Sequence, residues 1–297
     1  MSAETEAEAV PLDEAVRVFA VARPRLFGIA YRILGSATEA DDVVQDAWIR
    51  WQNTDRSVVR NAPAFLATTT TRLALNVATS ARSRRETYIG PWLPEPVDTS
   101  ADPALGAERG EALQLAVLVL LEKLPPTERA AYILREAFDY SFRLIAETLE
   151  LSEANARQLV GRARVHLASD RRATVSHDDQ RRLLEAFIAA AGSGDLTRLE
   201  SLLAEDVVTY SDGGGVVHAA RIPVIGRQRV ATFITGVLKK FDPTDTIAII
   251  EANGQPAVLV SRGTTVVGIG ALDSTPDGIS QILFMLNPGK LGQFRAS

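Results

Sequence analysis

The sequence predicts a multidomain protein in which two all-α units precede an α+β unit shaped like a cone. Up to Leu167 apolar residues recur at helical spacing, and several segments begin with residues that cap helices well. Gly90–Ala107 holds four prolines and is predicted to be an irregular linker. After Asp170 two helices come before several strand-like runs, which is typical of an α+β unit. We expect the first helical unit at 1–88, the linker at 89–109, the second helical unit at 110–170 and the cone at 171–297.

The composition excludes several classes of site. The chain of 297 residues has no cysteine, which excludes disulfides, thiolate catalysis and cysteine-ligated metals. His166, His177 and His218 are scattered without the spacing of a metal site, so we expect neither a metal nor a cofactor. No run of eighteen apolar residues is present, and the first residues are acidic rather than basic. The sequence therefore predicts a soluble, cytoplasmic protein without a signal peptide or membrane contact.

The charge is distributed unevenly along the chain. The formal net charge is −5, and residues 1–170 hold 19 of the 32 basic but 24 of the 37 acidic residues. The half with the helices is therefore the acidic half. Overall charge does not favour contact with nucleic acid, so any such contact must depend on local arginine clusters. We expect the chain to bind DNA poorly by itself.

Two amphipathic helices are predicted to open the first helical unit. One runs from Leu12 to a glycine stop at Gly35, and the next runs from an N-cap at Thr38 to about Gln52. The solvent-facing side of the second helix carries acidic and amide side chains. Their simplest role is to be solvated and to interact favourably with the helix dipole at the first turn. These residues are Asp41, Asp42, Gln45 and Asp46.

A third helix is predicted from Pro63 to about Arg82. It contains the run Thr68–Thr71, whose hydroxyl groups are poor helix formers but can reach phosphates or bases. Polar and basic residues follow on a shared face, and further arginines lie just beyond the helix end. The candidate nucleic-acid contacts of this segment are Thr68, Arg72, Asn76, Thr79, Arg82, Arg84 and Arg85.

The second helical unit is predicted to contain a helix-turn-helix. Glu111–Lys123 is strongly apolar and should form the core of this unit, and Pro125–Pro126 begins a helix that ends near Phe138. Ser141 caps a short helix, and Ser152 caps another with a buried apolar stripe and an arginine-rich outer face. In helix-turn-helix proteins such a helix lies in the DNA major groove, although most amphipathic helices with wet arginines bind nothing. Its candidate contacts are Ser152, Asn155, Arg157, Gln158, Arg162 and Arg164.

The turn between these two helices lacks the glycine that such turns usually offer. It reads Leu149-Glu150-Leu151. If the turn needs a residue with positive φ, Glu150 is strained there or the turn differs slightly. The angle of the last helix therefore depends on this turn.

The linker and the C-terminal region hold unusual residues in loops. Trp92 and Leu93 should dock on another part of the protein, because exposed apolar residues in a proline-rich segment usually do so. Asp212 precedes three glycines and most simply forms a turn. The pattern predicts helices at 178–191, 196–203 and 227–240, and strands at 207–210, 246–251, 257–262, 264–272 and 279–286.

Several motifs occur in the order found in one known family. Thr38–Trp48, the helix start Leu124–Arg129 and the helix-turn-helix resemble the two modules of extracytoplasmic-function sigma factors over about residues 11–170. Trp-Leu-Pro-Glu-Pro at 92–96 and Asp-Gly-Gly-Gly at 212–215 resemble a subgroup, called ECF41-like or SigJ-like, with a fused C-terminal SnoaL-like, NTF2-like domain. Asn287–Leu291 resembles the subgroup's Asn-Pro-Asp-Lys-Leu, but Gly289 replaces the aspartate, so any charged contact of that aspartate is missing here.

The resemblance implies a transcription initiation factor without catalysis of its own. Its partners would be the largest and second-largest subunits of core RNA polymerase, together with promoter DNA. The acidic helix face would dock on the clamp helices of the largest subunit. The Thr68–Arg85 segment and the loop before it would read the −10 element and capture a flipped base, and the helix after Ser152 would contact the −35 element. Regulatory contacts are expected at Trp92, Pro94, Glu95, Asp212, Gly213, Gly214, Gly215, Asn287, Pro288, Lys290 and Leu291.

Three interpretations of the C-terminal domain stay open. Tyr210, Asp212 and His218 would form an active site if the domain works like the isomerases and cyclases that use a carboxylate base. The domain would instead regulate the helical units within the same chain, or a small ligand in its pocket would bias their arrangement. For the whole chain the alternative is a stand-alone helix-turn-helix repressor or activator, against which the acidic N-terminal half and the polymerase-binding motif argue.

Overall fold

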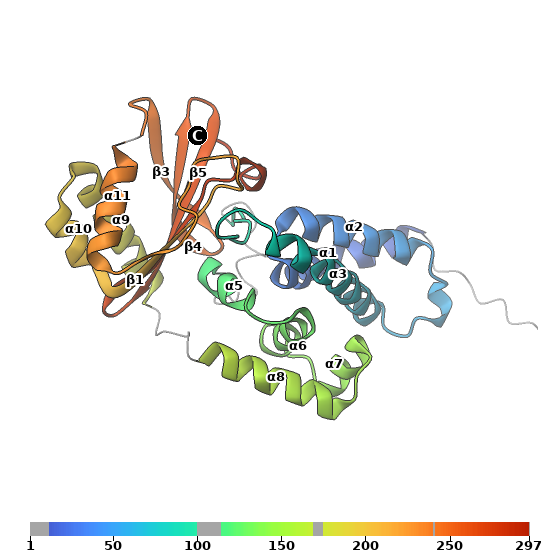
Figure 1. Cartoon of the computed structure of the whole chain (residues 1–297). Helices are drawn as coiled ribbons and strands as arrows, with labels where there is room; N and C mark the ends of the chain where they lie inside the picture. Colours follow the sequence, from blue (N-terminus) through green and yellow to red (C-terminus); the bar gives the residue numbers. More distant parts are fainter. Residues whose placement is uncertain (1–11, 100–113, 169–174, 240, 297) are drawn as a thin grey trace, which may run out of the picture. The chain divides into compact units, whose positions relative to one another are not determined.

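The helices and strands separate into two units, each built from two stretches of the sequence. In the computed structural model, described for residues 12–99, 114–168, 175–239 and 241–296, one unit joins the chain up to Arg82 with Leu124–His166. We call it the helical unit (Figure 1). The other, the sheet unit, joins Ser83–Lys123 with the chain from Leu167 onward. The linker therefore belongs to the same unit as the C-terminal domain.

The helical unit contains the helices that the periodicity predicts. Its first helix packs against both the second helix and the helix that precedes the helix-turn-helix. Tyr31, Ile33 and Leu134 are among its fully buried core residues. The elements are α1 (Leu12–Leu34), α2 (Ala37–Gln52), the 3-10 turn η1 (Arg56–Val58), α3 (Ala62–Glu86), α6 (Pro126–Glu136), α7 (Phe142–Leu149) and α8 (Glu153–Ala168), of which α3 and α8 end just inside the sheet unit.

Serine hydroxyls cap three of these helices. Ser36, in an extended conformation, accepts the backbone N–H of residue 39 at 3.2 Å and caps α2. The prediction of a cap at Thr38 is therefore wrong by two residues, because Thr38 already lies in the first helical turn. The predicted caps at Ser141 and Ser152 are confirmed, since each hydroxyl accepts a backbone N–H three residues further on at 3.2 Å.

The turn between α7 and α8 has the positive φ considered from its sequence. Glu150 adopts the left-handed conformation, with φ of 57° and ψ of 45°. The N–H of Leu151 bonds to the carbonyl of Ala146 at 2.9 Å, which closes the end of α7 in the manner of a Schellman motif. A residue with a side chain thus takes a position that glycine usually fills, at a cost of about 1 kcal/mol.

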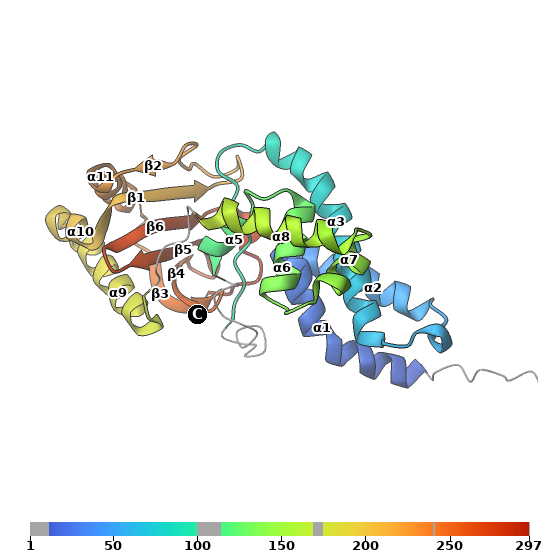
Figure 2. The same ribbon diagram turned by 90° about the horizontal axis from the view of Figure 1, so that it is seen from below.

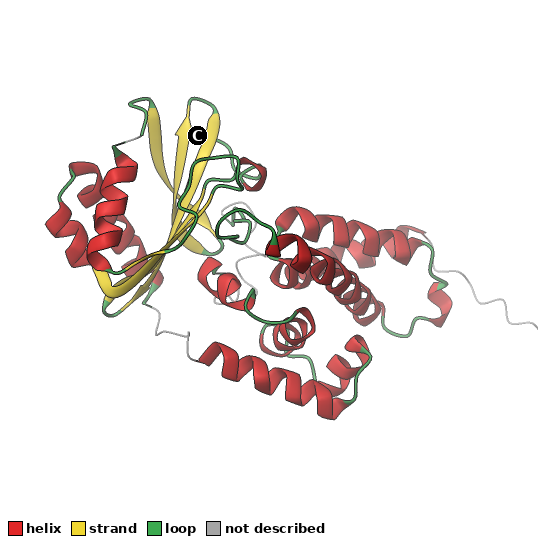
Figure 3. Ribbon diagram, viewed as in Figure 1, coloured by secondary structure: helices red, strands yellow, loops and turns green. Residues whose placement is uncertain are grey.

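The sheet unit has one mixed sheet with helices on both of its faces (Figures 2 and 3). The strand order is β2-β1-β6-β5-β4-β3, in which β1 pairs with β6 in parallel and all other neighbours are antiparallel. The helices are α5 (Leu115–Leu121), α9 (His177–Ser193), α10 (Leu196–Leu202), α11 (Arg227–Leu238) and the 3-10 turn η3 (Pro288–Lys290). The strands are β1 (Leu203–Asp212), β2 (Val224–Ile225), β3 (Asp245–Ala252), β4 (Gln255–Arg262), β5 (Thr265–Thr275) and β6 (Gly278–Met285).

Helices pack on one face of this sheet, and the linker packs on the other together with α5. On one face α9, α10 and α11 enclose an apolar core that includes Phe187, Val207 and Ile282. On the other face the linker residue Leu93 lies beside the β6 residues Leu283 and Met285. Within the described residues, no helix has the length and apolarity needed to cross a membrane.

The apolar helix before the helix-turn-helix has a different partner from the one predicted. Glu111–Lys123 was expected to form the core of the second helical unit, but its described part, α5, contacts β6 and belongs to the sheet unit. The physical reason is that Leu115 meets Ile269 and Leu283 on the linker face of the sheet. Residues 111–113 of the prediction lie outside the described part of the chain.

A tight hairpin fastens the linker to the sheet. Asn253 and Gly254 join β3 to β4 with positive φ at both positions, 54° and 68°, which is the geometry of a type I′ turn. The N–H of Val97 donates to Oδ1 of Asn253 at 2.9 Å, and the N–H of Asn253 donates to the carbonyl of Val97 at 2.9 Å. Both residues are buried, so the linker is hydrogen-bonded at this point like an additional strand.

We expect Asn253→Ala to lower the free energy of unfolding of the sheet unit by roughly 2–4 kcal/mol. Alanine leaves the buried N–H of Val97 without its partner and must adopt a left-handed backbone. Urea unfolding of the full chain, followed by circular dichroism, measures the change. Asn76→Ala, at an exposed position on α3, is the control, and equal midpoints for the two variants would contradict this role of Asn253.

Candidate functional site

A fully buried carboxylate lies at the end of β1. Asp212 has no exposed surface, and each of its two oxygens accepts two hydrogen bonds. Oδ1 accepts the hydroxyl of Tyr88 at 2.6 Å and the N–H of Gly214 at 3.0 Å. Oδ2 accepts the N–H of Leu93 at 3.0 Å and Nζ of Lys290 at 2.8 Å. A buried charge must be hydrogen-bonded or paired with an opposite charge. Here the linker and the C-terminal tail supply three of the four donors.

Lys290 joins the linker to this carboxylate. Besides Asp212, its Nζ donates to the carbonyl of Leu93 at 2.5 Å and lies 4.1 Å from the ring centre of Trp92. Burial lowers the pKa of Lys290, although the charge of Asp212 acts in the opposite direction. The ammonium group is therefore held by a carboxylate, a carbonyl and an aromatic face at once.

Two cations lie against the ring of Trp92. The guanidinium of Arg85, at the end of α3, lies 3.6 Å from the ring centre, and Lys290 also approaches the ring. Arg85 in turn forms an ion pair with Glu122, just after α5. We call Arg85, Tyr88, Trp92, Asp212, Asn287 and Lys290 the linker cluster.

The glycines after Asp212 are required by close contacts. A Cβ at Gly213 would lie 2.3 Å from the carbonyl oxygen of Val217, and one at Gly214 would lie 2.5 Å from Nδ2 of Asn287. Gly214 also has a φ of 64°. Nδ2 of Asn287 donates to the hydroxyl oxygen of Tyr88 at 2.8 Å, so this loop, the tail and the linker meet here. Gly215, with a φ of 72°, lies against the side chain of Ile89.

The structure brings the other expected regulatory residues to the same part of the sheet unit. Pro94, Glu95 and Leu291 are buried, and Pro288 begins η3. The N–H of Gly289 donates to Oδ1 of Asn287 at 3.0 Å. The sequence analysis did not identify Tyr88, and it assigned Arg85 to DNA rather than to the linker cluster. Tyr88 stands four residues before Trp92, and an aromatic residue so close to the linker could have indicated a contact there.

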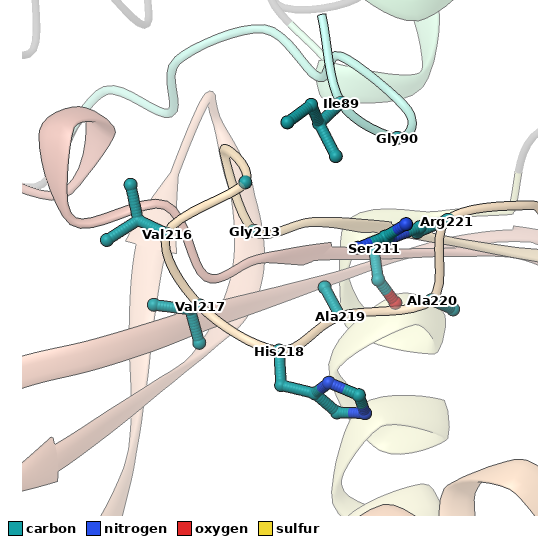
Figure 4. Close-up of a pocket in the computed structure, with 11 residues that line it drawn as sticks. Ile89, Gly90, Ser211, Gly213, Val216, Val217, His218, Ala219, Ala220 and Arg221 are labelled. Carbon is teal, nitrogen blue, oxygen red and sulfur yellow. The ribbon is translucent and has the colours of Figure 1, made fainter.

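A pocket of about 490 Å³ lies beside the linker cluster. Its walls are Ile89 and Gly90 of the linker, Ser211 of β1 and the loop from Gly213 to Arg221. Figure 4 shows Ile89 and Gly90 on one side of it and His218 on the loop opposite. Of the three residues considered for catalysis, His218 lines this pocket, whereas Asp212 is committed to the hydrogen bonds of the linker cluster.

The predicted polymerase-binding residues share one exposed face of α2. Next to them Trp48 is half-buried and tilted against Phe19, with 4.9 Å between ring centres. Arg23 of α1 donates to one carboxylate of the set, that of Asp41, at 2.9 Å. The exposed residues are Asp41, Asp42, Gln45 and Asp46.

The candidate −10 residues on α3 have mixed surroundings. Thr68 lies within 3.3 Å of the Thr148 hydroxyl, Arg72 contacts the end of α7, and Arg85 belongs to the linker cluster. Asn76 and Thr79 are exposed. Arg82 and Arg84 lie in α3, but their side chains are outside the described part of the structure.

Part of the threonine run cannot meet nucleic acid. Thr70 and Thr71 have no exposed surface, and the hydroxyl of Thr71 donates to the carbonyl of Ala67 at 2.8 Å. The prediction that the run Thr68–Thr71 presents its hydroxyls to phosphates or bases is wrong for these two residues. The run crosses the packed face of α3, a placement that the sequence pattern does not reveal.

Helix α8 carries its arginines along its flanks. Arg162 donates to Oε2 of the buried Glu128 at 3.3 Å, and Arg164 donates to Oε1 of Glu136 at 2.7 Å. Arg157 pairs with Glu153 and lies 4.9 Å from the ring centre of Phe142. Ser152, Asn155 and Gln158 are exposed.

The exposed ridge of α8 opposite its buried stripe is uncharged. The stripe consists of Ala156, Val160, Ala163 and Leu167, and a helical repeat places residues 154, 158, 161 and 165 on the other side. All four are exposed: Ala154, Gln158, Gly161 and Val165.

Comparisons with known proteins agree on one family. Family models match at Sigma-70 region 2, over residues 19–85, and Sigma-70 region 4, over residues 114–167. The ECF RNA polymerase sigma factor SigJ of Mycobacterium tuberculosis is 36% identical over 264 residues, 87% of this chain and 83% of that protein. A probable ECF RNA polymerase sigma factor of that species, SigI, is 31% identical over 280 residues, 92% and 93% of the two chains. The crystal structure of M. tuberculosis SigJ matches with a TM-score of 0.76 at 31% identity, covering 94% of this chain and 98% of that one.

We expect the stability of the sheet unit to depend on Tyr88 at alkaline pH. Burial, and then the bonded Asp212, raise the pKa of Tyr88 above its usual value of 10.0. The fold thus favours the neutral phenol, and this stabilisation is present below pH 10 and is lost as the pH rises further. Between about pH 9.5 and 11 the free energy of unfolding should fall more steeply for the natural chain than for Tyr88→Phe.

Urea unfolding at a series of pH values tests this expectation. Lys290 has a lowered pKa and acts in the opposite sense, but it is present in both proteins and cancels in the comparison. Parallel pH profiles would show that Tyr88 is not held neutral by the linker cluster.

Proposed function

This chain belongs to the extracytoplasmic-function family of RNA polymerase sigma factors, and we propose that its sheet unit controls that activity from within the same chain. As a sigma factor it directs core RNA polymerase to promoters and starts transcription. The observation that carries the proposal is the linker cluster, in which the segment between the two DNA-binding modules is bound to the C-terminal domain. The modules we assign are 1–88 for region 2 and 110–170 for region 4, with the regulatory domain at 171–297.

Sigma factors are not a family of enzymes, and we propose that this chain has no catalysis of its own. A carboxylate base needs a free oxygen to take a proton. In Asp212 each oxygen already accepts two donors, one of them the ammonium of Lys290. Asp212 therefore supports the architecture of the linker cluster rather than an isomerase-type reaction.

For region 2 we propose two surfaces. The exposed acidic face of α2 binds the largest subunit of core RNA polymerase, and a contact with the second-largest subunit accompanies it. The exposed polar residues of α3, Asn76 and Thr79, together with the arginines that follow, contact the −10 element. Promoter DNA and core polymerase are thus the partners of the chain.

For the −35 element we propose that the ridge and the flanks of α8 act differently. Gln158 lies in the exposed ridge, where a glutamine side chain can bond an adenine edge. Arg157, Arg162 and Arg164 lie on the flanks, beside acidic partners, and suit phosphate contacts on either side of the groove. Ser152 and Asn155 lie at the N-terminus of this helix and add further contacts with the −35 DNA.

We expect Gln158→Ala to relax the preference at one −35 position, with a loss of roughly 1–3 kcal/mol in discrimination. Arg162→Ala should weaken all promoters alike and make binding less dependent on salt. Transcription by the reconstituted holoenzyme from a randomised −35 library measures both effects. A uniform loss in the Gln158 variant, or unaltered selectivity and strength in all the arginine variants, would refute the assignment.

The sheet unit can control promoter binding because the linker cluster binds the segment between the two DNA-binding modules. The segment Ser83–Lys123 belongs to the sheet unit, yet in sequence it lies between the two stretches of the helical unit and contains the linker between region 2 and region 4. The same interactions that bury Asp212 therefore fix the connection between the two DNA-binding modules. A change in the C-terminal domain that releases Leu93 or Lys290 would free this connection.

We expect Trp92→Ala and Asp212→Asn each to change run-off transcription by core RNA polymerase severalfold. Loss of the ring removes the aromatic surface that both cations contact, and the amide of asparagine introduces a donor where the carboxylate accepts hydrogen bonds. Asp245→Asn, which breaks an ion pair with Arg262 elsewhere in the sheet unit, is the matched control.

Point variants are preferable to truncation near Asp170, because truncation would uncover the apolar linker face around Leu93 and Leu115. Unchanged transcription by both variants, with intact circular dichroism, would refute control by the sheet unit. Unaided DNA binding and no transcript from any variant or from the natural chain would favour a stand-alone repressor or activator instead.

We also propose that a small ligand bound in the pocket affects the docking of the linker. The pocket beside the linker cluster shares Ile89 and Gly90 with the linker, so a bound molecule would contact the regulated segment directly. Such a ligand shifts the arrangement only if it binds the docked and undocked linker with different affinity.

A further inference from the structure

Three arginines hold region 2 and region 4 together inside the helical unit. Each donates to a main-chain carbonyl of the other module. Arg72 of α3 bonds to the end of α7, Arg25 of α1 bonds to the segment after α6, and Arg129 of α6 bonds to the end of α1. The exchange is reciprocal, because two of these arginines come from region 2 and one comes from region 4.

Arg72 forms the most extensive of these contacts. Its Nε donates to the carbonyl of Thr148 at 2.9 Å, and its Nη2 donates to the carbonyl of Glu147 at 3.0 Å. Its Nη1 lies 2.9 Å from Oε1 of Glu150. The guanidinium thus binds two carbonyls of the last turn of α7 and the side chain of the strained residue that ends it.

Arg25 and Arg129 act at the other end of the contact. Nη1 of Arg129, which is almost fully buried, donates to the carbonyl of Ile33 in the last turn of α1 at 2.8 Å. Nη2 of Arg25 donates to the carbonyl of Phe138 at 3.3 Å, and its guanidinium lies 5.1 Å from the ring centre of the same residue.

For Arg72 and Arg129 the acceptors are helix ends, whose last carbonyls have no partner within the helix and carry partial negative charge. The guanidinium of Arg72 supplies a planar fork of donors that suits two such oxygens at once. The carbonyl that Arg25 binds, that of Phe138, follows the end of α6. These caps exist only while the two modules touch, so they stabilise the closed arrangement specifically.

The closed arrangement cannot read a whole promoter. The −10 and −35 elements lie about 25 base pairs apart, which is roughly 85 Å at 3.4 Å per base pair. Helices α3 and α7 share hydrogen bonds of about 3 Å, so the modules that carry them cannot lie on both elements at once. The two modules must separate before both elements are bound.

We propose that Arg25, Arg72 and Arg129 form a latch that keeps regions 2 and 4 closed in the free chain and opens when core polymerase and promoter are bound. The proposal rests on the sigma-factor function stated above. Arg72 has two uses in it, because the guanidinium that leaves α7 becomes available to −10 DNA. The αL turn at Glu150 is then supported by the latch rather than by a glycine.

A distance measurement tests the latch directly. The chain has no cysteine, so Gln52→Cys and Thr127→Cys provide two spin-label sites, one exposed on each module. Pulsed dipolar spectroscopy on the free full-length chain should give one short distance. Arg72→Ala should raise the population at longer distances roughly tenfold or more, and Arg25→Ala with Arg72→Ala should raise it further.

Two further variants separate the latch from other effects. Arg72→Lys keeps a charge that can bind phosphate but loses the fork, so it should open the free chain nearly as far as Arg72→Ala. Arg143→Ala removes an exposed arginine that pairs with Glu147 within α7, and it should leave the distance unchanged.

The outcomes distinguish the latch from the function on which it rests. If the free chain keeps its short distance in the Arg72 and Arg25–Arg72 variants, the latch is wrong. It is also wrong if the natural chain keeps the short distance while it transcribes with core polymerase. If no promoter-dependent transcript forms, the sigma-factor function fails, yet the free-chain distances still support or refute the latch.

Discussion

The sheet unit depends on one buried carboxylate. Asp212 is acceptable in its apolar surroundings because Tyr88, Leu93, Gly214 and Lys290 donate to it together. If the linker left, the carboxylate would lose the hydroxyl of Tyr88 and the N–H of Leu93, and a buried acceptor left without a donor typically costs about 1–3 kcal/mol or more. The linker, the glycine loop and the C-terminal tail are therefore docked as a set, and the narrow space for a Cβ at Gly214, which lies against Asn287 of the tail, follows from that docking.

This arrangement gives the C-terminal domain a mechanical means of control. The segment 83–123 separates the two stretches of the helical unit in sequence, and a fully extended segment of about 40 residues would reach roughly 130 Å. Held against the sheet at Leu93, Val97 and α5, the same segment is far shorter in reach. The two modules must separate by roughly 85 Å on a promoter. The distance that they can reach therefore depends on how much of the linker stays docked on the sheet. The domain need not touch DNA to affect promoter binding.

Local chemistry was predictable from the sequence, whereas distant partners were not. The caps at Ser141 and Ser152 and the five longer strands follow from short-range patterns, and the structure confirms them. Of the two possibilities left open for the turn at Glu150, the structure has the one with positive φ. Arg72 and α5 were assigned to DNA and to a helical core, because their sequence neighbours do not reveal the carbonyls of α7 or the surface of β6. Strand β2 has two residues and no periodicity to detect.

The charge pairing on α8 explains how an acidic helical half can carry a DNA-reading helix. Arg157, Arg162 and Arg164 each have a carboxylate partner, and that of Arg162, Glu128, is buried and cannot move away. A phosphate that approaches such an arginine also meets the field of the carboxylate, so the net attraction is smaller than for a free guanidinium. The pairs therefore orient the arginines while they limit nonspecific affinity. In the function proposed here, stable promoter binding then requires the contacts of the polymerase, and selectivity at the −35 element is assigned to the uncharged ridge around Gln158.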